Sequence, residues 1–140
     1  MNKPFSQACE NNHSPIGAVL TRLLSTSASV LELGSGTGQH AVWFAQQLPH
    51  LHWQTSDRME NHSGINQWLD ESGLDNIGAP IALDVSRDAW PTEPFDAVFS
   101  SNTAHIMAWP DVEIMFSRVA GTLSAGGLFF LYGPMKYSGV

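Results

Sequence analysis

The sequence predicts a doubly wound, parallel α/β sheet in strand order 3-2-1-4-5, with helices covering both faces. Short apolar runs of strand length alternate with segments of helical periodicity, a pattern typical of parallel strands joined by helical crossovers. A stretch with three glycines, 34–38, directly follows the first apolar run. Only ten residues, 85–94, join the third and fourth runs, and a helical crossover hardly fits into so short a connection.

The first half of the chain alternates helical and extended patterns. Ser14 followed by Pro15 is typical of an N-cap and the first position of a helix, and Pro49 ends a later helical segment. The expected elements, in chain order, are a helix over 15–25, a strand over 30–33, a helix over 41–48, a strand over 51–56 that ends at Asp57, and a helix up to Gly73.

The second half supplies three further strands and one helix. The expected elements are a strand over 79–83 that ends at Asp84, a strand over 95–99, a helix over 112–123 and, after Gly126 and Gly127, a strand over 128–132. Ten extended residues reach about 33 Å, which exceeds two strand spacings of about 4.8 Å each. Segment 85–94 can therefore carry strand four to the far side of strand one. The carboxyl end of strand one then becomes the topological switch point, where such sheets bind ligands.

Length and composition favour one intracellular domain, 1–140. Asp and Glu outnumber Lys and Arg by 13 to 6, and the net charge of −7 disfavours nucleic acid and anionic membranes as partners. The single cysteine, Cys9, cannot form an internal disulfide or a cysteine-based metal site. No apolar run approaches the roughly 20 residues of a membrane span. We expect a cytoplasmic protein without a metal.

The glycine-rich stretch carries the clearest chemical signal. Its pattern is G-x-G-x-G from Gly34 through Gly36 to Gly38, with Glu32 two residues before the first glycine. Glycines at this point let a ligand approach the backbone closely. Gln39 stands where the dinucleotide fingerprint G-x-G-x-x-G has Gly or Ala, which weakens a nicotinamide or flavin interpretation.

This pattern resembles the first motif, [DE]-x-G-x-G-x-G, of the class I, seven-strand, Rossmann-like S-adenosylmethionine-dependent methyltransferases. The resemblance implies S-adenosyl-L-methionine as cofactor, with Glu32 near the methionyl amine and Asp57 on the ribose hydroxyls. Asp57 follows Gly38 by 19 residues, which fits a ribose-binding carboxylate. Asp84 and Val85 stand where that family contacts adenine. The cofactor-binding residues expected are Asn12, Glu32, Gly34, Ser35, Gly36, Gly38, Asp57, Asp84 and Val85.

Within that family the chain is similar to a poorly characterised branch that includes methyltransferase-like protein 26. The matching segments are 8–16, 31–40, 53–57, 83–85, 102–105 and 132–134. That branch has a basic residue where Asn11 stands, which separates this chain from it at one position. Segment 1–28 is expected to form an N-terminal lid and helix, and 29–140 the core.

The family continues beyond its fifth strand with a helix and an antiparallel hairpin, and we expect both to be absent from this chain. A parallel strand left at a sheet edge exposes unpaired backbone groups. Pairing of two copies into a homodimer through that edge is therefore expected.

The resemblance also implies the catalytic side of the site. Asn102 and His105 follow strand four, facing the expected methyl group, and His105 could remove a proton from the acceptor. Packed beside Ile106 and Trp109, His105 could equally be structural. Residues 101–104 lack the [DN]-P-P-[YF] motif of amino methyltransferases that act on DNA bases or glutamine amides, which argues against those substrates. The acceptor expected is a small molecule. The alternatives are a catalytically silent cofactor-binding or protein-interaction module and, less favoured, a nicotinamide oxidoreductase.

Overall fold

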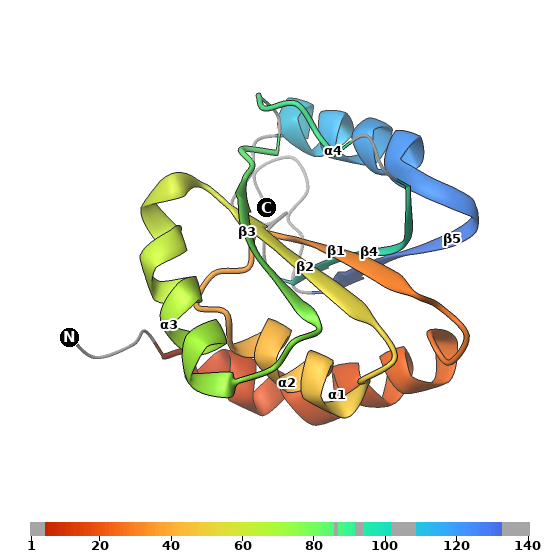
Figure 1. Cartoon of the computed structure of the whole chain (residues 1–140). Coiled ribbons are helices and arrows are strands. Elements are labelled where there is room, and N and C mark those ends of the chain that lie inside the picture. The colour runs from red at the N-terminus through yellow and green to blue at the C-terminus, as the bar shows by residue number, and fades with distance from the viewer. Residues whose placement is uncertain (1–4, 86, 92–93, 102–108, 133–140) are drawn as a thin grey trace.

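The computed structural model describes residues 5–85, 87–91, 94–101 and 109–132 and contains one sheet flanked by helices (Figure 1). The elements are α1 (Gln7–Leu23), β1 (Ser29–Leu33), α2 (Gln39–Gln47), β2 (His52–Asp57), a 3-10 turn (Met59–Asn61), α3 (His62–Ser72), β3 (Ile77–Ala82), β4 (Phe95–Ser101), α4 (Trp109–Thr122) and β5 (Leu123–Tyr132). Helices α1 and α2 cover one face of the sheet, and α4 covers the other.

The sheet has the predicted order, β3-β2-β1-β4-β5, and every neighbouring pair is parallel. Val30 of β1 is paired with Trp53 of β2 on one side and with Ala97 of β4 on the other. The chain therefore crosses from β3 past β2 and β1 before it enters β4, as the short connection indicated. The carboxyl end of β1 lies at the switch point between the two halves of the sheet.

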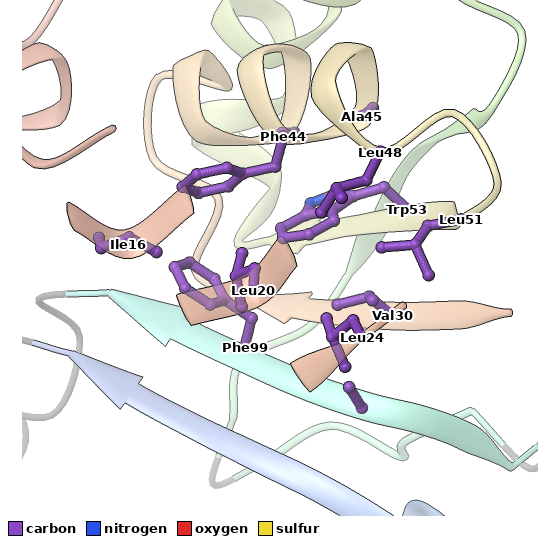
Figure 2. Close-up of a cluster of buried hydrophobic side chains, with 12 residues drawn as sticks. Ile16, Leu20, Leu24, Val30, Phe44, Ala45, Leu48, Leu51, Trp53 and Phe99 are labelled. Atoms are coloured by element: carbon purple, nitrogen blue, oxygen red, sulfur yellow. The ribbon is translucent and has the colours of Figure 1, made fainter. Parts of the chain in front are cut away.

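Two clusters of buried apolar side chains fill the space between the sheet and its helices. The first cluster joins α1 and α2 to the sheet (Figure 2), and its members are Ile16, Leu20, Leu24, Val30, Ala41, Phe44, Ala45, Leu48, Leu51, Trp53, Ala97 and Phe99. The second cluster lies under α4 and contains Leu31, Leu33, Leu83, Val85, Phe95, Val98, Val112, Met115 and Val119. Strands β1 and β4 contribute to both clusters, which explains why their sequences are apolar at successive positions.

Two boundaries differ most from the prediction, and the others differ by at most three residues. Helix α1 begins at Gln7, and Pro15 lies inside it rather than at its first position. Proline removes one helical hydrogen bond, but bonds from α2 to Ser6 and Glu10 hold the preceding turns. Strand β5 begins at Leu123, because Gly126, with φ 78°, forms an irregularity within the strand instead of a turn before it.

Strand β5 stands at one edge of the described sheet. The homodimer expected there stays a prediction, as does the division of the chain at residue 28.

Among the residues that the structure describes, no helix combines the length and apolar character needed to cross a membrane.

Asp96, near the start of β4, joins the amino ends of three strands. Its Oδ2 accepts the backbone N–H of Ala28 at 2.6 Å and of Ser29 at 3.2 Å, and its Oδ1 accepts the Ser124 hydroxyl at 3.1 Å. The Ala28 N–H contributes most to holding the pKa of Asp96 below its ordinary value, although partial burial opposes it. The ionised carboxylate thus stabilises the junction of β1, β4 and β5.

Replacing Asp96 with alanine is expected to lower the free energy of unfolding by about 2 kcal/mol at neutral pH, because hydrogen bonds to a charged group are lost. The effect should shrink as the pH falls through the lowered pKa, where the wild-type carboxylate is protonated. Urea denaturation followed by tryptophan fluorescence measures both. Asp70→Ala, at an exposed position of α3, is the control. Equal midpoints for the two variants would contradict the assignment.

Candidate functional site

The loop 34–38 joins β1 to α2 at the carboxyl edge of the sheet and is bonded to the end of β2. The Ser35 N–H donates to the Ser56 carbonyl oxygen at 2.8 Å, and the Ser56 N–H donates to Ser35 Oγ at 3.0 Å. The Ser56 hydroxyl in turn donates to the Glu32 carbonyl oxygen. These bonds extend the contact between β1 and β2 into the loop, so that it is held on a rigid support.

Two glycines of this loop have different surroundings. At Gly38, with φ 94°, an added Cβ would lie 3.3 Å from both the Ile65 Cα and the Trp68 Cβ of α3. At Gly36, with φ 63°, the nearest heavy atom to such a Cβ is the Gly34 carbonyl oxygen, 4.0 Å away. Gly38 therefore permits close packing of α3, whereas Gly36 leaves room for a ligand against the backbone.

The Asp57 carboxylate connects the end of β2 to this open part of the loop. Only 7% of the residue is exposed. Its Oδ2 accepts the Gly36 N–H at 2.8 Å, and its Oδ1 accepts the Arg58 N–H at 2.7 Å and the Asn61 side-chain amide at 3.0 Å. A carboxylate offers about four acceptor positions, so three bonds leave capacity for another donor. The structure thus brings together two residues that the sequence assigned to one site.

Glu32 lies beneath the loop rather than on its surface. It is 1% exposed, and its Oε1 accepts the Trp53 indole N–H at 3.2 Å. Burial raises the pKa of Glu32 to about 7, hydrogen bonds from Ser35 and Trp53 oppose the increase, and the nearby Asp57 charge adds to it. Direct contact between Glu32 and a ligand amine stays a prediction.

Of the remaining residues predicted for the site, some lie near the glycine loop and others do not. The Leu83 N–H donates to the Asp57 carbonyl oxygen at 3.0 Å, which brings Asp84 to the same edge of the sheet. The Val85 side chain packs in the second cluster, so it serves the core. Asn12 lies in α1, and its role in binding stays a prediction. Asn102 and His105 lie outside the described residues.

Sequence reasoning missed several residues that shape this edge. Asn61 binds the Asp57 carboxylate from four positions further along the chain, but Asp57 ends a strand, so helical spacing gives no sign of this contact. Ser56 and Trp53 hold Ser35 and Glu32, but a strand residue gives no single-sequence sign of such a partner. In sequence, Gln39 only weakens a dinucleotide fingerprint. Nothing there indicates that its side chain is almost fully buried.

A pair of buried histidines lies behind the loop, between α1 and α2. The ring centroids of His13 and His40 are 5.1 Å apart, and none of their four nitrogens has a hydrogen-bond partner among the residues that the structure describes. His13 stacks on Trp43, and His40 stacks on Phe44. Burial lowers the pKa of His40 to about 4, with a further contribution from His13. Burial also lowers the pKa of His13, although Glu10, 3.7 Å away, opposes this.

The titratable side chains do not form a metal centre in the part of the chain that the structure describes. No group of three His, Cys, Asp or Glu side chains there is placed to hold an ion. The described groups at this edge include the Asp57 and Glu32 carboxylates, the glycine backbone and the Asn61 amide.

The fold resembles those of several solved proteins, two of them methyltransferases. The S-adenosylmethionine-dependent methyltransferase SibL matches with a TM-score of 0.73 and 21% identity, over 82% of this chain and 34% of its own. The glycopeptide N-methyltransferase MtfA, solved with S-adenosyl-L-methionine, matches with a TM-score of 0.75 and 22% identity, over 86% and 53%. The PH0226 protein from Pyrococcus horikoshii OT3 matches with a TM-score of 0.79 and 15% identity, over 91% and 59%.

These TM-scores show a shared fold, and the chain spans 34 to 59% of the length of those three proteins. A family model described as "Protein of unknown function (DUF938)" matches residues 3–140, which is nearly the whole sequence.

Proposed function

The chain belongs to the DUF938 family of proteins of unknown function, and from that premise we propose that it binds S-adenosylmethionine and transfers the methyl group to a small acceptor. One observation carries the proposal. The Asp57 carboxylate is bonded to the Gly36 N–H at the point where the glycine loop leaves room for a ligand. This arrangement lies at the switch point of a doubly wound sheet, the usual ligand position in such folds.

The residues at this edge suit a cationic nucleoside better than a dinucleotide. Asp57 has remaining acceptor capacity for ribose hydroxyls. Glu32 and Asp57 together favour positive charge, such as that of a sulfonium or an ammonium group. A pyrophosphate at Gly36 would instead meet the Asp57 carboxylate at close range. The crystal structures of MtfA and SibL add support from proteins of the same fold.

In this proposal the chain acts mainly by positioning. Bound S-adenosylmethionine supplies a methyl group activated by its sulfonium charge. Asp57 would hold the ribose, and the Gly36 backbone would allow close approach. Glu32 would contribute negative charge from below the loop. His105, with Asn102 three residues before it in sequence, is proposed to remove a proton from the molecule that receives the methyl group. No covalent protein nucleophile is required.

The narrower assignments are part of the same proposal. We propose that the chain belongs to the poorly characterised branch that includes methyltransferase-like protein 26, and that it is cytoplasmic. The acceptor would be a small molecule, and neither nucleic acid nor membrane is proposed as a partner, because the net charge is −7.

Calorimetric titration tests the binding half of the proposal. The wild-type chain should bind S-adenosylmethionine and S-adenosylhomocysteine with micromolar affinity and should not bind NAD. Asp57→Ala should weaken binding at least tenfold, because the ribose acceptor and the bond to Gly36 are both lost. Asp70→Ala, an exposed carboxylate on α3, is the matched control and should bind as the wild type does.

Absence of binding by the wild-type chain, or equal affinity for NAD, would contradict the proposal. Methyl transfer is tested separately, by incubating the chain with a labelled methyl donor and a panel of small acceptors. Cofactor binding without any labelled product would favour the catalytically silent module instead.

A further inference from the structure

Gln39 is a buried amide, and three of its four side-chain hydrogen bonds join it to a distant part of the chain. Its Oε1 accepts the Ser6 backbone N–H and, at 2.9 Å, the Thr37 hydroxyl. Its Nε2 donates to the Ser6 carbonyl oxygen at 3.2 Å and to Glu10 Oε1 at 3.1 Å. The residue is 1% exposed. A buried amide with two accepted and two donated bonds is fully satisfied, so the position selects glutamine specifically.

These partners connect the glycine loop to the start of α1. Gln39 is the first residue of α2 and directly follows Gly38. Thr37, within the loop, also accepts the Gln39 backbone N–H through its hydroxyl at 3.2 Å. Ser6 precedes α1, and Glu10 lies in its first turn. One network thus runs from the loop through a single side chain to the first turn of a helix 29 to 33 positions earlier in sequence.

The two ends of α1 are held differently. Its second half is anchored by apolar packing, because Ile16 and Leu20 belong to the first cluster (Figure 2). Gly17 there lets the Trp43 ring approach so closely that an added Cβ would lie 2.7 Å from it. In the first turn, the described side chains of Gln7 and Glu10 lie outside that cluster. Gln39 provides polar contacts to this turn, through Ser6 and Glu10.

We propose that Gln39 is a positioning residue that couples the first turn of α1 to the glycine loop, so that adenosyl-cofactor binding and docking of this turn strengthen each other. The identity of the ligand rests on the proposed function. The coupling follows because Thr37 and Gln39 form one hydrogen-bonded unit with Ser6, and an arrangement of the loop that suits the ligand also suits the helix. Such coupling is reciprocal by thermodynamic necessity.

Hydrogen exchange and calorimetry together test the coupling. Exchange of the amides at the start of α1 is measured with and without S-adenosylhomocysteine, whose affinity is measured in parallel. Gln39→Ala should weaken that affinity roughly tenfold. The slowing of exchange that the ligand causes in α1 should fall by the same factor. Gln46→Ala, at an exposed position of the same helix, should match the wild type in both measurements.

Exchanging the amide at position 39 with the carboxylate at position 10 provides a second test, in which no side chain is shortened. Gln39→Glu keeps an acceptor for the Ser6 N–H but places a carboxylate against Glu10. Combining it with Glu10→Gln restores an amide–carboxylate pair. The double variant should recover at least half of the affinity, on a logarithmic scale, that the single variant loses.

The outcomes separate this inference from the function it rests on. If the wild-type chain binds S-adenosylhomocysteine and Gln39→Ala retains that affinity within twofold while α1 exchanges faster, Gln39 has a structural role only and the coupling is overturned. Failure of the swap to recover affinity would also count against it. If the wild-type chain binds no cofactor, the proposed function itself fails.

Discussion

The Glu32→Gln variant is expected to be about 3 kcal/mol more stable to unfolding than the wild-type chain at pH 8, and equally stable at pH 4. Burial raises the pKa of Glu32 from 4.5 to about 7 in the folded chain. The folded state therefore binds this proton more tightly than the unfolded state does. The resulting stabilisation is complete below pH 4.5 and is lost as the pH rises through 7. Glutamine has no such proton to lose, and its amide oxygen can still accept the Trp53 N–H.

Urea denaturation at pH 4, 6 and 8 measures this effect. Glu113→Gln, at an exposed position of α4, is the matched control and should leave the difference between pH 8 and pH 4 unchanged. Equal stability of Glu32→Gln and the wild type at pH 8 would show that no buried charge is present. Under the proposed function, the stabilised variant should bind S-adenosylmethionine more weakly, since it lacks the negative charge beneath the loop.

The second large effect is a loss of stability at low pH, opposite in direction to that of Glu32. It comes from His13 and His40, which lie behind the loop. Burial lowers the pKa of His40 from 6.5 to about 4, so the unfolded state binds this proton more tightly. The stability that depends on neutral His40 is present above pH 6.5 and is lost as the pH falls through 4. The loss amounts to about 3 kcal/mol. The lowered pKa of His13 acts in the same direction.

Between pH 4.5 and 6.5 the contributions of Glu32 and His40 oppose each other, which hides both in the wild-type chain. We therefore expect Glu32→Gln to lose about 3 kcal/mol of stability between pH 7 and pH 4, and the double variant Glu32→Gln/His40→Leu to lose much less. His52→Asn, at an exposed position of β2, serves as the control substitution in the same background. If the stability of the Glu32→Gln single variant did not change between pH 7 and pH 4, the loss of stability could not be assigned to His40.

The strand order and the meeting of Asp57 with the glycine loop could be predicted from sequence. Both follow from covalent reach and topology. Segment 85–94 is too short for a helical crossover but long enough to pass two strands, and this places β4 beside β1. Once β1 and β2 are parallel neighbours, their carboxyl ends share one edge, and Asp57 must lie near Gly36.

The surroundings of the buried polar groups could not be predicted in this way. Trp53 reads as an apolar strand residue, and only the sheet register shows that its indole N–H reaches Glu32. The start of α1 also differs from the prediction, because residues distant in sequence determine it. Pro15 is a strong local signal for a helix start, but contacts of Ser6 and Glu10 with Gln39 outweigh it. At the start of α1, partners distant in sequence therefore outweigh the local signal.

The position of β4 beside β1 has a consequence for folding. The Asp96 carboxylate that binds the Ala28 N–H is 68 residues away from it in sequence, and β1 gains its second neighbour only when β4 arrives. Such long-range closure is slow compared with the local formation of β1, α2 and β2. During synthesis the strand that supports the glycine loop therefore stays open along one side until most of the chain has emerged. The edge of the sheet that carries the glycine loop is among the first parts to be synthesised and among the last to be completed.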